Sequence, residues 1–284
     1  MSKKLILQGP AADQAVLAQV AAPACPRSST PIHAHALRCE GLAFTPALKA
    51  AVESAADAAG VDASFVDAGL TLADFRLVAM DMDSTLITIE CIDEIADMQG
   101  LKPQVSAITE AAMRGELDFS ESLKRRVALL EGLPVEALER VYEERLRISP
   151  GGEAMLQAVQ AAGLKTLLVS GGFTFFTERL KTRLGLDYVH ANVLEAEGGV
   201  LTGRVVGGIV DAEEKMRTVQ RVCAELGIEP KQAIVMGDGA NDLRMMGIAG
   251  LSVAFRAKPV VRAQADVALN FCGLDAILSI LQQS

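Results

Sequence analysis

The chain has 284 residues, of which 50% are hydrophobic and only 4% are aromatic, and its formal net charge is -9. This length allows one large domain or two modest ones with packed cores. A nucleic-acid partner would require a basic face, and no segment offers the roughly 20 apolar residues of a membrane span. We therefore expect a small-molecule partner, with neither nucleic acid nor membrane.

The five cysteines and three histidines show no metal-binding spacing. The cysteines lie far apart without a CxxC pair, and an odd number in an unsecreted chain indicates free thiols. The apolar run Leu5–Leu7 near the N-terminus is too short for a signal peptide. The sequence therefore predicts a cytoplasmic protein without a zinc site.

Residues 1–72 alternate between short apolar runs and helical segments, which predicts a small α+β module. Thr45 as N-cap, followed by Pro46, marks the start of its second helix. The expected strands are Lys4–Gln8, Ile32–Leu37 and Ala63–Val66, and the expected helices are Asp13–Ala22 and Pro46–Ala59.

The apolar run Phe75–Met80 ends at the polar Asp81 and predicts a buried parallel strand. Residues 88–147 follow a helical pattern, with prolines at helix starts and glycines at the breaks, which predicts a bundle of four helices. Strand and helix alternate again after Pro150. The predicted fold is therefore α/β: a Rossmann-like parallel sheet with helices on both faces, formed by residues 73–87 and 148–284 and interrupted by the bundle.

The elements expected after the bundle follow one another closely in the sequence. The predicted strands are Lys165–Val169, Val189–Leu194, Val200–Val206, Ala233–Met236 and Leu251–Ala254. The predicted helices are Glu153–Ala162, Phe173–Leu184, Ala212–Leu226, Leu243–Met246 and Leu274–Gln282.

The first chemical motif is the pair Asp81 and Asp83, which follows the first strand of this sheet. Ligands of open α/β sheets bind at the carboxyl ends of the strands. One carboxylate of such a pair can attack phosphorus while the other handles protons. An Asp-x-Asp before Ser-Thr is also typical of a turn with a helix cap, and the motif alone favours neither reading.

Two further motifs are weak by themselves. Ser170-Gly171-Gly172 follows a strand, and a hydroxyl with glycine amides at the start of a helix can hold a phosphate, although ordinary turns use the same residues. Lys215 can neutralise phosphoryl oxygens and an aspartyl nucleophile, although most lysines on helices face solvent.

The fourth motif, Gly237-Asp238-Gly239-Ala240-Asn241-Asp242, also follows a strand. Two carboxylates and an amide on a tight turn offer the hard oxygen ligands that Mg²⁺ prefers. The motif resembles a dinucleotide fingerprint, but Asp242 replaces the third glycine and would repel a pyrophosphate. Phosphoryl transfer needs a nucleophile, a metal, a cation and a proton handler together, and the four motifs supply all of them.

The order of these motifs resembles the haloacid dehalogenase superfamily, and within it the branch that hydrolyses phosphoserine. The resemblance runs from about Phe75 to the C-terminus, roughly three quarters of the chain. It implies hydrolysis of O-phospho-L-serine to serine and phosphate through an aspartyl-phosphate, which is the last step of serine biosynthesis. It also implies that residues 88–147 form a cap that closes over the substrate.

The resemblance assigns the reaction chemistry to four aspartates. Asp81 is the expected nucleophile, and Asp83 the expected general acid and then general base. Mg²⁺ is expected on Asp81, on the main-chain carbonyl of Asp83 and on Asp238, with Asp242 supporting the metal from nearby.

The resemblance assigns the substrate to residues of both the sheet and the cap. The substrate-binding residues that it implies are Glu90 for the ammonium, Arg126 for the carboxylate, Met113 and Phe119 as the wall, Ser170, Gly171 and Lys215 for the phosphoryl group, and Asn241 for the phosphate and its water. A fixed anion and a guanidinium fork suit a zwitterionic substrate. Arg125 is adjacent, so a shift of one residue would exchange the two arginines.

Alternatives remain for the function and for residues 1–72. A sugar phosphatase or phosphomutase of the same superfamily would keep the core, but a neutral sugar would not use Glu90 and Arg126. A phosphorylation-switched receiver domain or an amino-acid-sensing non-enzyme forms the alternative class. Some family members carry N-terminal modules of the ACT type, and a docking or dimerisation module, and with it a homodimer, is an equal alternative here.

Overall fold

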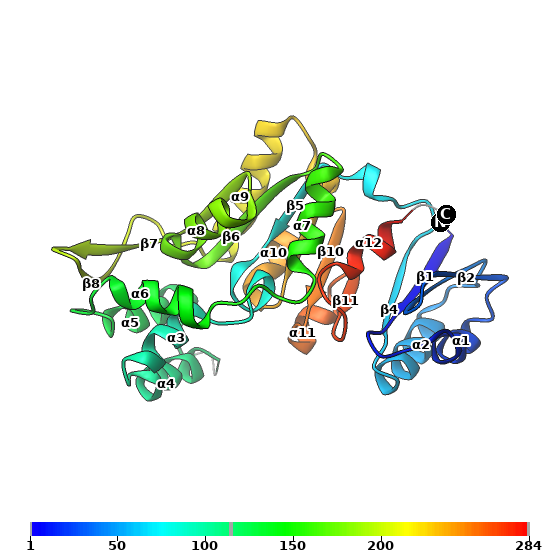
Figure 1. The fold of residues 1–284 in the computed structure, drawn as a ribbon, viewed down its shortest axis with the longest axis horizontal. Coiled ribbons are helices and arrows are strands. Elements are labelled where there is room, and N and C mark those ends of the chain that lie inside the picture. The colour runs from blue at the N-terminus through cyan, green and yellow to red at the C-terminus, as the bar shows by residue number, and fades with distance from the viewer. Residues whose placement is uncertain (1, 114–115, 283–284) are drawn as a thin grey trace.

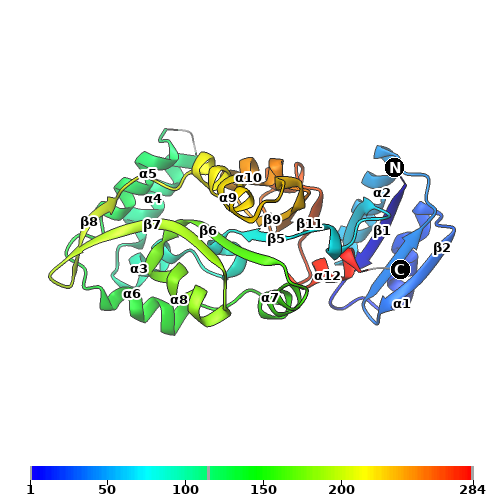
Figure 2. The ribbon, with the colours of Figure 1, turned by 90° about the horizontal axis from the view of Figure 1, so that it is seen from above.

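The computed structural model describes residues 2–113 and 116–282, without the side chain of Met113. It contains a seven-stranded sheet, a helical cap and a separate four-stranded sheet near the N-terminus. Both views place the N-terminal sheet and the cap at opposite ends of the molecule, with the seven-stranded sheet between them (Figures 1 and 2).

The seven-stranded sheet has the order β11-β10-β9-β5-β6-β7-β8, and its strands are parallel except for the antiparallel β8. Its central strands are fully buried, as expected for a parallel sheet covered on both faces. The strands are β5 (Leu77–Met80), β6 (Lys165–Phe173), β7 (Tyr188–Glu197), β8 (Val200–Val206), β9 (Ala233–Gly237), β10 (Leu251–Phe255) and β11 (Val267–Leu269). The short β11 was not predicted.

Helices cover both faces of this sheet. Successive side chains of a strand point to opposite faces, and accordingly Val78 and Met80 belong to one apolar cluster while Leu77 and Ala79 belong to the other. The first cluster is closed by α7 (Gly152–Ala161), α8 (Thr174–Leu184) and α12 (Ala276–Leu281), and the second by α9 (Ala212–Leu226), α10 (Leu243–Ile248) and α11 (Pro259–Arg262). The predicted α/β architecture is therefore confirmed.

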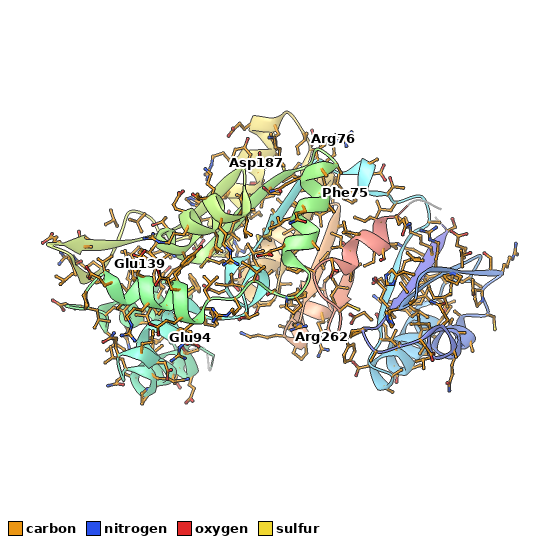
Figure 3. All side chains as sticks on the ribbon, in the orientation of Figure 1. Phe75, Arg76, Glu94, Glu139, Asp187 and Arg262 are labelled. Atoms are coloured by element: carbon orange, nitrogen blue, oxygen red, sulfur yellow. The ribbon has the colours of Figure 1, made fainter. Side chains whose placement is uncertain are left out.

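The cap follows the first strand of the sheet and consists of helices. These are α3 (Cys91–Met98), α4 (Lys102–Met113), α5 (Phe119–Ala128), α6 (Glu136–Arg140) and its wider continuation η4 (Val141–Arg145). An isolated bridge between Ile87 and Ile148 joins the two connections to the sheet. Arg179 on α8 donates to both carboxylate oxygens of Glu139 on α6, which ties the cap to the core. Figure 3 labels Glu139 at its place on the cap.

The N-terminal module has the order β1, α1, β2, β3, α2, β4, which is the ferredoxin-like arrangement. Its antiparallel sheet has the order β2-β3-β1-β4. The elements are β1 (Lys3–Gln8), α1 (Gln14–Ala21), β2 (Ser28–His33), β3 (Ala36–Glu40), α2 (Pro46–Ala58) and β4 (Asp62–Asp67). The predicted single strand Ile32–Leu37 is wrong: a turn at residues 34–35 divides that segment between β2 and β3.

One face of the module's sheet packs on its own helices and the other packs on the core. Leu5 and Leu7 lie in the module's apolar cluster, whereas Ile6 between them joins the large cluster of the core. The Asp62 carboxylate accepts hydrogen bonds from the amides of three successive core residues, 270–272. The module is therefore held to the core by both apolar packing and hydrogen bonds.

Across residues 2–113 and 116–282, none of the helices has the length and apolar character needed to cross a membrane.

Candidate active site

A cavity of about 890 Å³ lies at the carboxyl end of the parallel sheet, where the cap faces it. This is the edge at which open α/β sheets bind ligands. The predicted site residues that line it are Asp81, Asp83, Glu90, Phe119, Arg126, Ser170, Gly171, Asp238 and Asn241. The structure therefore brings residues that follow β5 and β9, residues at the end of β6, and residues of the cap into one cavity.

Behind this cavity, Lys215 on α9 bridges two buried aspartates. Its Nζ lies 2.8 Å from Asp81 Oδ1 and 2.8 Å from Asp242 Oδ1, and the lysine is fully buried. Burial alone would lower the pKa of Lys215, but the carboxylates of Asp242 and Asp81 raise it overall. The ammonium therefore stays charged, and it fixes the Asp81 carboxylate together with the Met82 amide, which donates to Asp81 Oδ1 at 2.7 Å.

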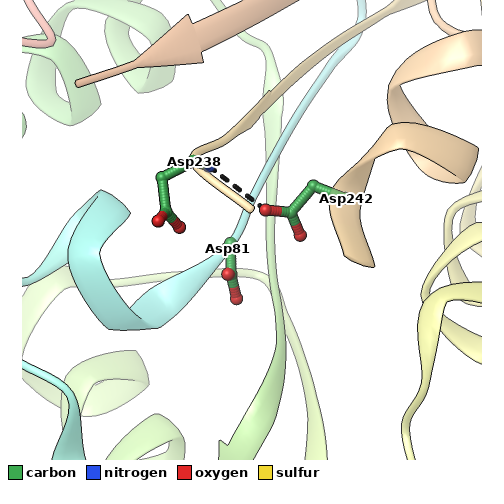
Figure 4. Close-up of side chains that lie close together, drawn as sticks. All are labelled: Asp81, Asp238 and Asp242. Carbon is green, nitrogen blue, oxygen red and sulfur yellow. Dashed lines mark hydrogen bonds between the residues drawn. The ribbon is translucent and has the colours of Figure 1, made fainter. Parts of the chain in front are cut away.

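Asp242 differs from Asp81 and Asp238 in how completely its carboxylate is used. Its second oxygen accepts from the amides of Asp238 and Gly239 at 3.1 and 3.0 Å, so both oxygens are occupied (Figure 4). From the described residues, the Asp238 carboxylate receives only a long hydrogen bond of 3.4 Å, donated by the Thr85 hydroxyl. The Asp242 carboxylate thus stabilises the turn of residues 237–242, whereas the Asp238 carboxylate keeps lone pairs that can accept a further ligand.

Asp81, Asp238 and Asp242 place carboxylate oxygens within 4.8 Å of one another. Burial, followed by the neighbouring Asp242, raises the pKa of Asp238 to about 7, and this outweighs the opposing effect of Lys258 and Lys215. Hard oxygen donors with open lone pairs in a partly solvated cleft fit a divalent cation such as Mg²⁺. The residues present therefore fit a metal site.

Asp83 enters the cavity from the turn that follows β5. Ser84 adopts a left-handed backbone (φ 56°), which turns the chain sharply away from the sheet. The Cys91 amide at the start of α3 donates to Asp83 Oδ1 at 3.1 Å. Burial, followed by the charge of Glu90, raises the pKa of Asp83 to about 7, so that this carboxyl exchanges protons near neutral pH.

The segment Ser170-Gly171-Gly172 lies in an irregular end of β6, because the pairing with β7 shifts register between Val169 and Phe173. The strand extends further than predicted, through Phe173, and α8 begins at Thr174, one residue after the predicted helix start. The Ser170 hydroxyl accepts from the Gly172 amide at 2.8 Å. Its own proton is therefore available to a group in the cavity.

Neither glycine of this segment leaves room for a side chain. A Cβ at Gly171 would lie 2.9 Å from the Phe119 ring, and a Cβ at Gly172 would lie 2.7 Å from the Asp83 carboxylate. Such approaches are closer than real Cβ atoms make. The two glycines thus allow the close approach of the Phe119 ring from the cap and of the Asp83 carboxylate from the turn after β5.

The cap contributes two charged residues from different helices. Glu90, just before α3, accepts a hydrogen bond from the Ser84 hydroxyl at 2.7 Å. Arg126 on α5 lines the cavity, and burial lowers its pKa although Asp93 and Glu90 oppose this. Arg125 instead forms an exposed ion pair with Glu121. The side chain of Met113 lies outside the described residues.

Sequence reasoning missed several residues of this region. Asp93 lines the cavity from the first turn of α3, three positions after Glu90, which immediately precedes that helix. An acidic residue so close to Glu90 could have indicated it. Lys258 and Arg244 also line the cavity, and Arg244 pairs with Glu213. No sequence signal distinguishes these two from surface cations.

The chain was compared with known proteins. The family model of haloacid dehalogenase-like hydrolases matches residues 78–247. A phosphoserine phosphatase of Polaromonas sp. (strain JS666) is 59% identical over 75% of this chain and 92% of its own length. The crystal structure of a HAD-family hydrolase from Salmonella enterica serovar Typhi superimposes with a TM-score of 0.91 at 32% identity, covering 99% of both chains.

A third similarity is to a solved structure described as a phospho-aspartyl intermediate analogue of phosphoserine phosphatase. It has a TM-score of 0.68 and 38% identity, and it covers 73% of this chain and 99% of that one. The extent of the family match and the identity to the Polaromonas enzyme show that the chain belongs to the haloacid dehalogenase-like hydrolase family.

Proposed function

We propose that this protein is a phosphoserine phosphatase that works through an aspartyl-phosphate on Asp81. The observation that carries the proposal is the buried contact of Asp81 with Lys215 at the base of a cavity whose other wall holds Glu90 and Arg126. A nucleophile with a fixed cation serves any phosphomonoester. The paired charges of the cap suit an amino acid in particular, and the Polaromonas relative, named for phosphoserine, agrees with this substrate.

In the first half of the proposed reaction, a carboxylate oxygen of Asp81 attacks phosphorus and the bond from phosphorus to the serine oxygen breaks. Asp83, protonated at the start, gives its proton to the leaving serine oxygen. Lys215, the Ser170 hydroxyl and the Gly171 backbone, with Asn241, are suited to the charge on the phosphoryl oxygens.

In the second half, Asp83 is ionised and takes a proton from a water molecule as its oxygen attacks the aspartyl-phosphate. The bond between phosphorus and the Asp81 oxygen breaks, which returns Asp81 as a carboxylate and releases inorganic phosphate. Asp83 is again protonated for the next turnover. The same side chain thus serves as acid and then base, and the Cys91 amide holds it in place.

The proposed metal is Mg²⁺, held by the Asp81 carboxylate, the main-chain carbonyl of Asp83 and Asp238. When bound, it would neutralise charge on the phosphoryl group and on the carboxylates around it. Asp242 is the supporting residue in this proposal, because Lys215 and two backbone amides already occupy its oxygens.

The proposed cap comprises residues 88–147 and recognises the serine part of the substrate. Glu90 would pair with the ammonium and Arg126 with the carboxylate, while Phe119 forms the wall beside Gly171. Closure excludes water and strengthens both ion pairs. Since the product is serine, we place the reaction at the end of serine biosynthesis, in the cytoplasm.

The test is phosphate release with Mg²⁺ from L-phosphoserine, D-phosphoserine, phosphothreonine, a sugar phosphate and an aryl phosphate. We expect a strong preference for phosphoserine in kcat/KM. A flat profile, or a preference for the sugar phosphate, would retain the aspartyl-phosphate chemistry and reject the assignment of Glu90 and Arg126.

A further inference from the structure

Asn192 on β7 is a buried amide side chain that forms hydrogen bonds at both ends, next to the site but outside its cavity. It is 1% exposed. Its Nδ2 donates to the Gly171 carbonyl at 2.8 Å, and its Oδ1 accepts from the Val210 amide at 2.9 Å. A buried amide that uses both ends connects two chain segments, here the end of β6 and the entrance of α9.

The first connection sets the orientation of a peptide in the proposed phosphate-binding segment. The carbonyl of Gly171 and the amide of Gly172 belong to one trans peptide, so they point in opposite directions. When Asn192 holds the carbonyl, the amide is turned toward the Ser170 hydroxyl, to which it donates at 2.8 Å. The regular ladder cannot provide this hold, because β6 leaves its register with β7 between Val169 and Phe173.

The second connection fixes the start of the helix that carries the lysine. Val210 precedes Asp211, whose side chain caps α9 through the amide of Glu214 at 2.9 Å. Lys215 lies one turn along, and its amide donates to the Asp211 carbonyl. Glycines occupy positions 207 and 208, so the preceding chain provides little stiffness of its own.

We propose that Asn192 is a positioning residue that aligns the Ser170 hydroxyl and the Lys215 ammonium on one phosphoryl group. The proposal rests on the function proposed above only in taking the ligand to be a phosphoryl group, whichever alcohol carries it. Asn192 acts through the two segments and touches no reacting atom.

The experiment compares Asn192→Asp with wild type, using an aryl phosphate as substrate and inorganic phosphate as inhibitor. Aspartate keeps the acceptor for Val210 but places a carboxylate against the Gly171 carbonyl. We expect kcat to fall and phosphate to inhibit more weakly, each by about tenfold or more, which is the size of one buried hydrogen bond. Gln264→Glu is the matched control, since it removes an exposed amide-to-carbonyl bond to Val260, and neither residue lines the cavity.

A double-mutant cycle separates positioning from general destabilisation. If Asn192 acts partly through Ser170, the loss caused by Asn192→Ala should be much smaller in a Ser170→Ala background. Equal losses in both backgrounds, or an unchanged inhibition constant for phosphate in the folded Asp variant, would overturn the proposal. If the Asp variant does not fold, Asn192→Ser serves in its place, because a serine hydroxyl cannot span both partners.

These readouts are independent of the serine assignment. A wrong substrate would appear in the phosphomonoester panel as a flat profile, whereas a wrong role for Asn192 would leave phosphate inhibition unchanged whatever the preferred substrate.

Discussion

The active-site edge of the large sheet and the interface that holds the N-terminal module use the same local device for different purposes. Asp242 accepts hydrogen bonds from two successive amides, and Asp62 accepts from three. Asp62 is enclosed at a junction between two sheets, whereas Asp242 also contacts Lys215 and lies beside a cavity. A buried carboxylate that accepts hydrogen bonds from backbone amides therefore holds the chain in place at both sites. At Asp242 it also belongs to the candidate active site, because Lys215 and the cavity adjoin it.

The largest effect is expected at the active-site edge, from the change Asp81→Asn. An amide cannot form the acyl phosphate, so turnover should fall by about 10⁴ or more, as expected for loss of a nucleophile. Phosphate release and trapping of labelled phosphate on the protein measure it, with circular dichroism as the control for folding. Near wild-type hydrolysis would contradict the covalent mechanism.

Arg126→Ala tests the cap. Loss of the guanidinium should lower kcat/KM for phosphoserine by about 100-fold, as for truncation of one partner in a buried charge pair, and should change hydrolysis of an aryl phosphate little. Arg125→Ala is the matched control, because that arginine pairs with Glu121 at an exposed position and is not among the residues that line the cavity. Equal losses on both substrates would remove Arg126 from carboxylate recognition.

Asp62→Ala tests the interface that holds the N-terminal module to the core. Three partly buried amides would lose their acceptor, so the free energy of unfolding should fall by about 3 kcal/mol. Turnover by the folded variant should remain at the wild-type level, because neither Asp62 nor its hydrogen-bond partners at residues 270–272 line the cavity. Urea unfolding and steady-state kinetics measure the two effects. Asp62→Asn should lose less stability, since it keeps one acceptor oxygen.

The smallest effect is expected for Ser64→Ala at the same interface. Ser64 is 1% exposed, and its hydroxyl has no hydrogen-bond partner among the described residues. Removing an unsatisfied buried hydroxyl should leave stability unchanged or raise it slightly. A loss of stability in urea unfolding would show that the hydroxyl has a partner after all.

The sequence by itself determined the α/β class and the order of the site motifs. Local patterns were sufficient because fully buried strands such as β5 and β9 are continuous apolar runs that end at polar residues. The parallel arrangement then places those ends at one edge of the sheet. Asp81, Ser170 and Asp238 could therefore be assigned to one site before any coordinate was known.

Only the tertiary structure decided which residues face one another. It placed Arg126 in the cavity and Arg125 outside, paired Lys215 with both Asp81 and Asp242, and joined Gly171 to Val210 through the unpredicted Asn192. These contacts connect residues far apart in the chain, so no local pattern contains them.

The N-terminal module illustrates the same limit. Its strand–helix alternation was readable, but the division of Ile32–Leu37 into two strands depends on a turn with no glycine or proline to mark it. Ile6 and Val66 look like ordinary core residues of that module, yet they pack into the large cluster of the catalytic domain. Hydrophobicity specifies that a side chain is buried, and only the assembled fold specifies the surface on which it is buried.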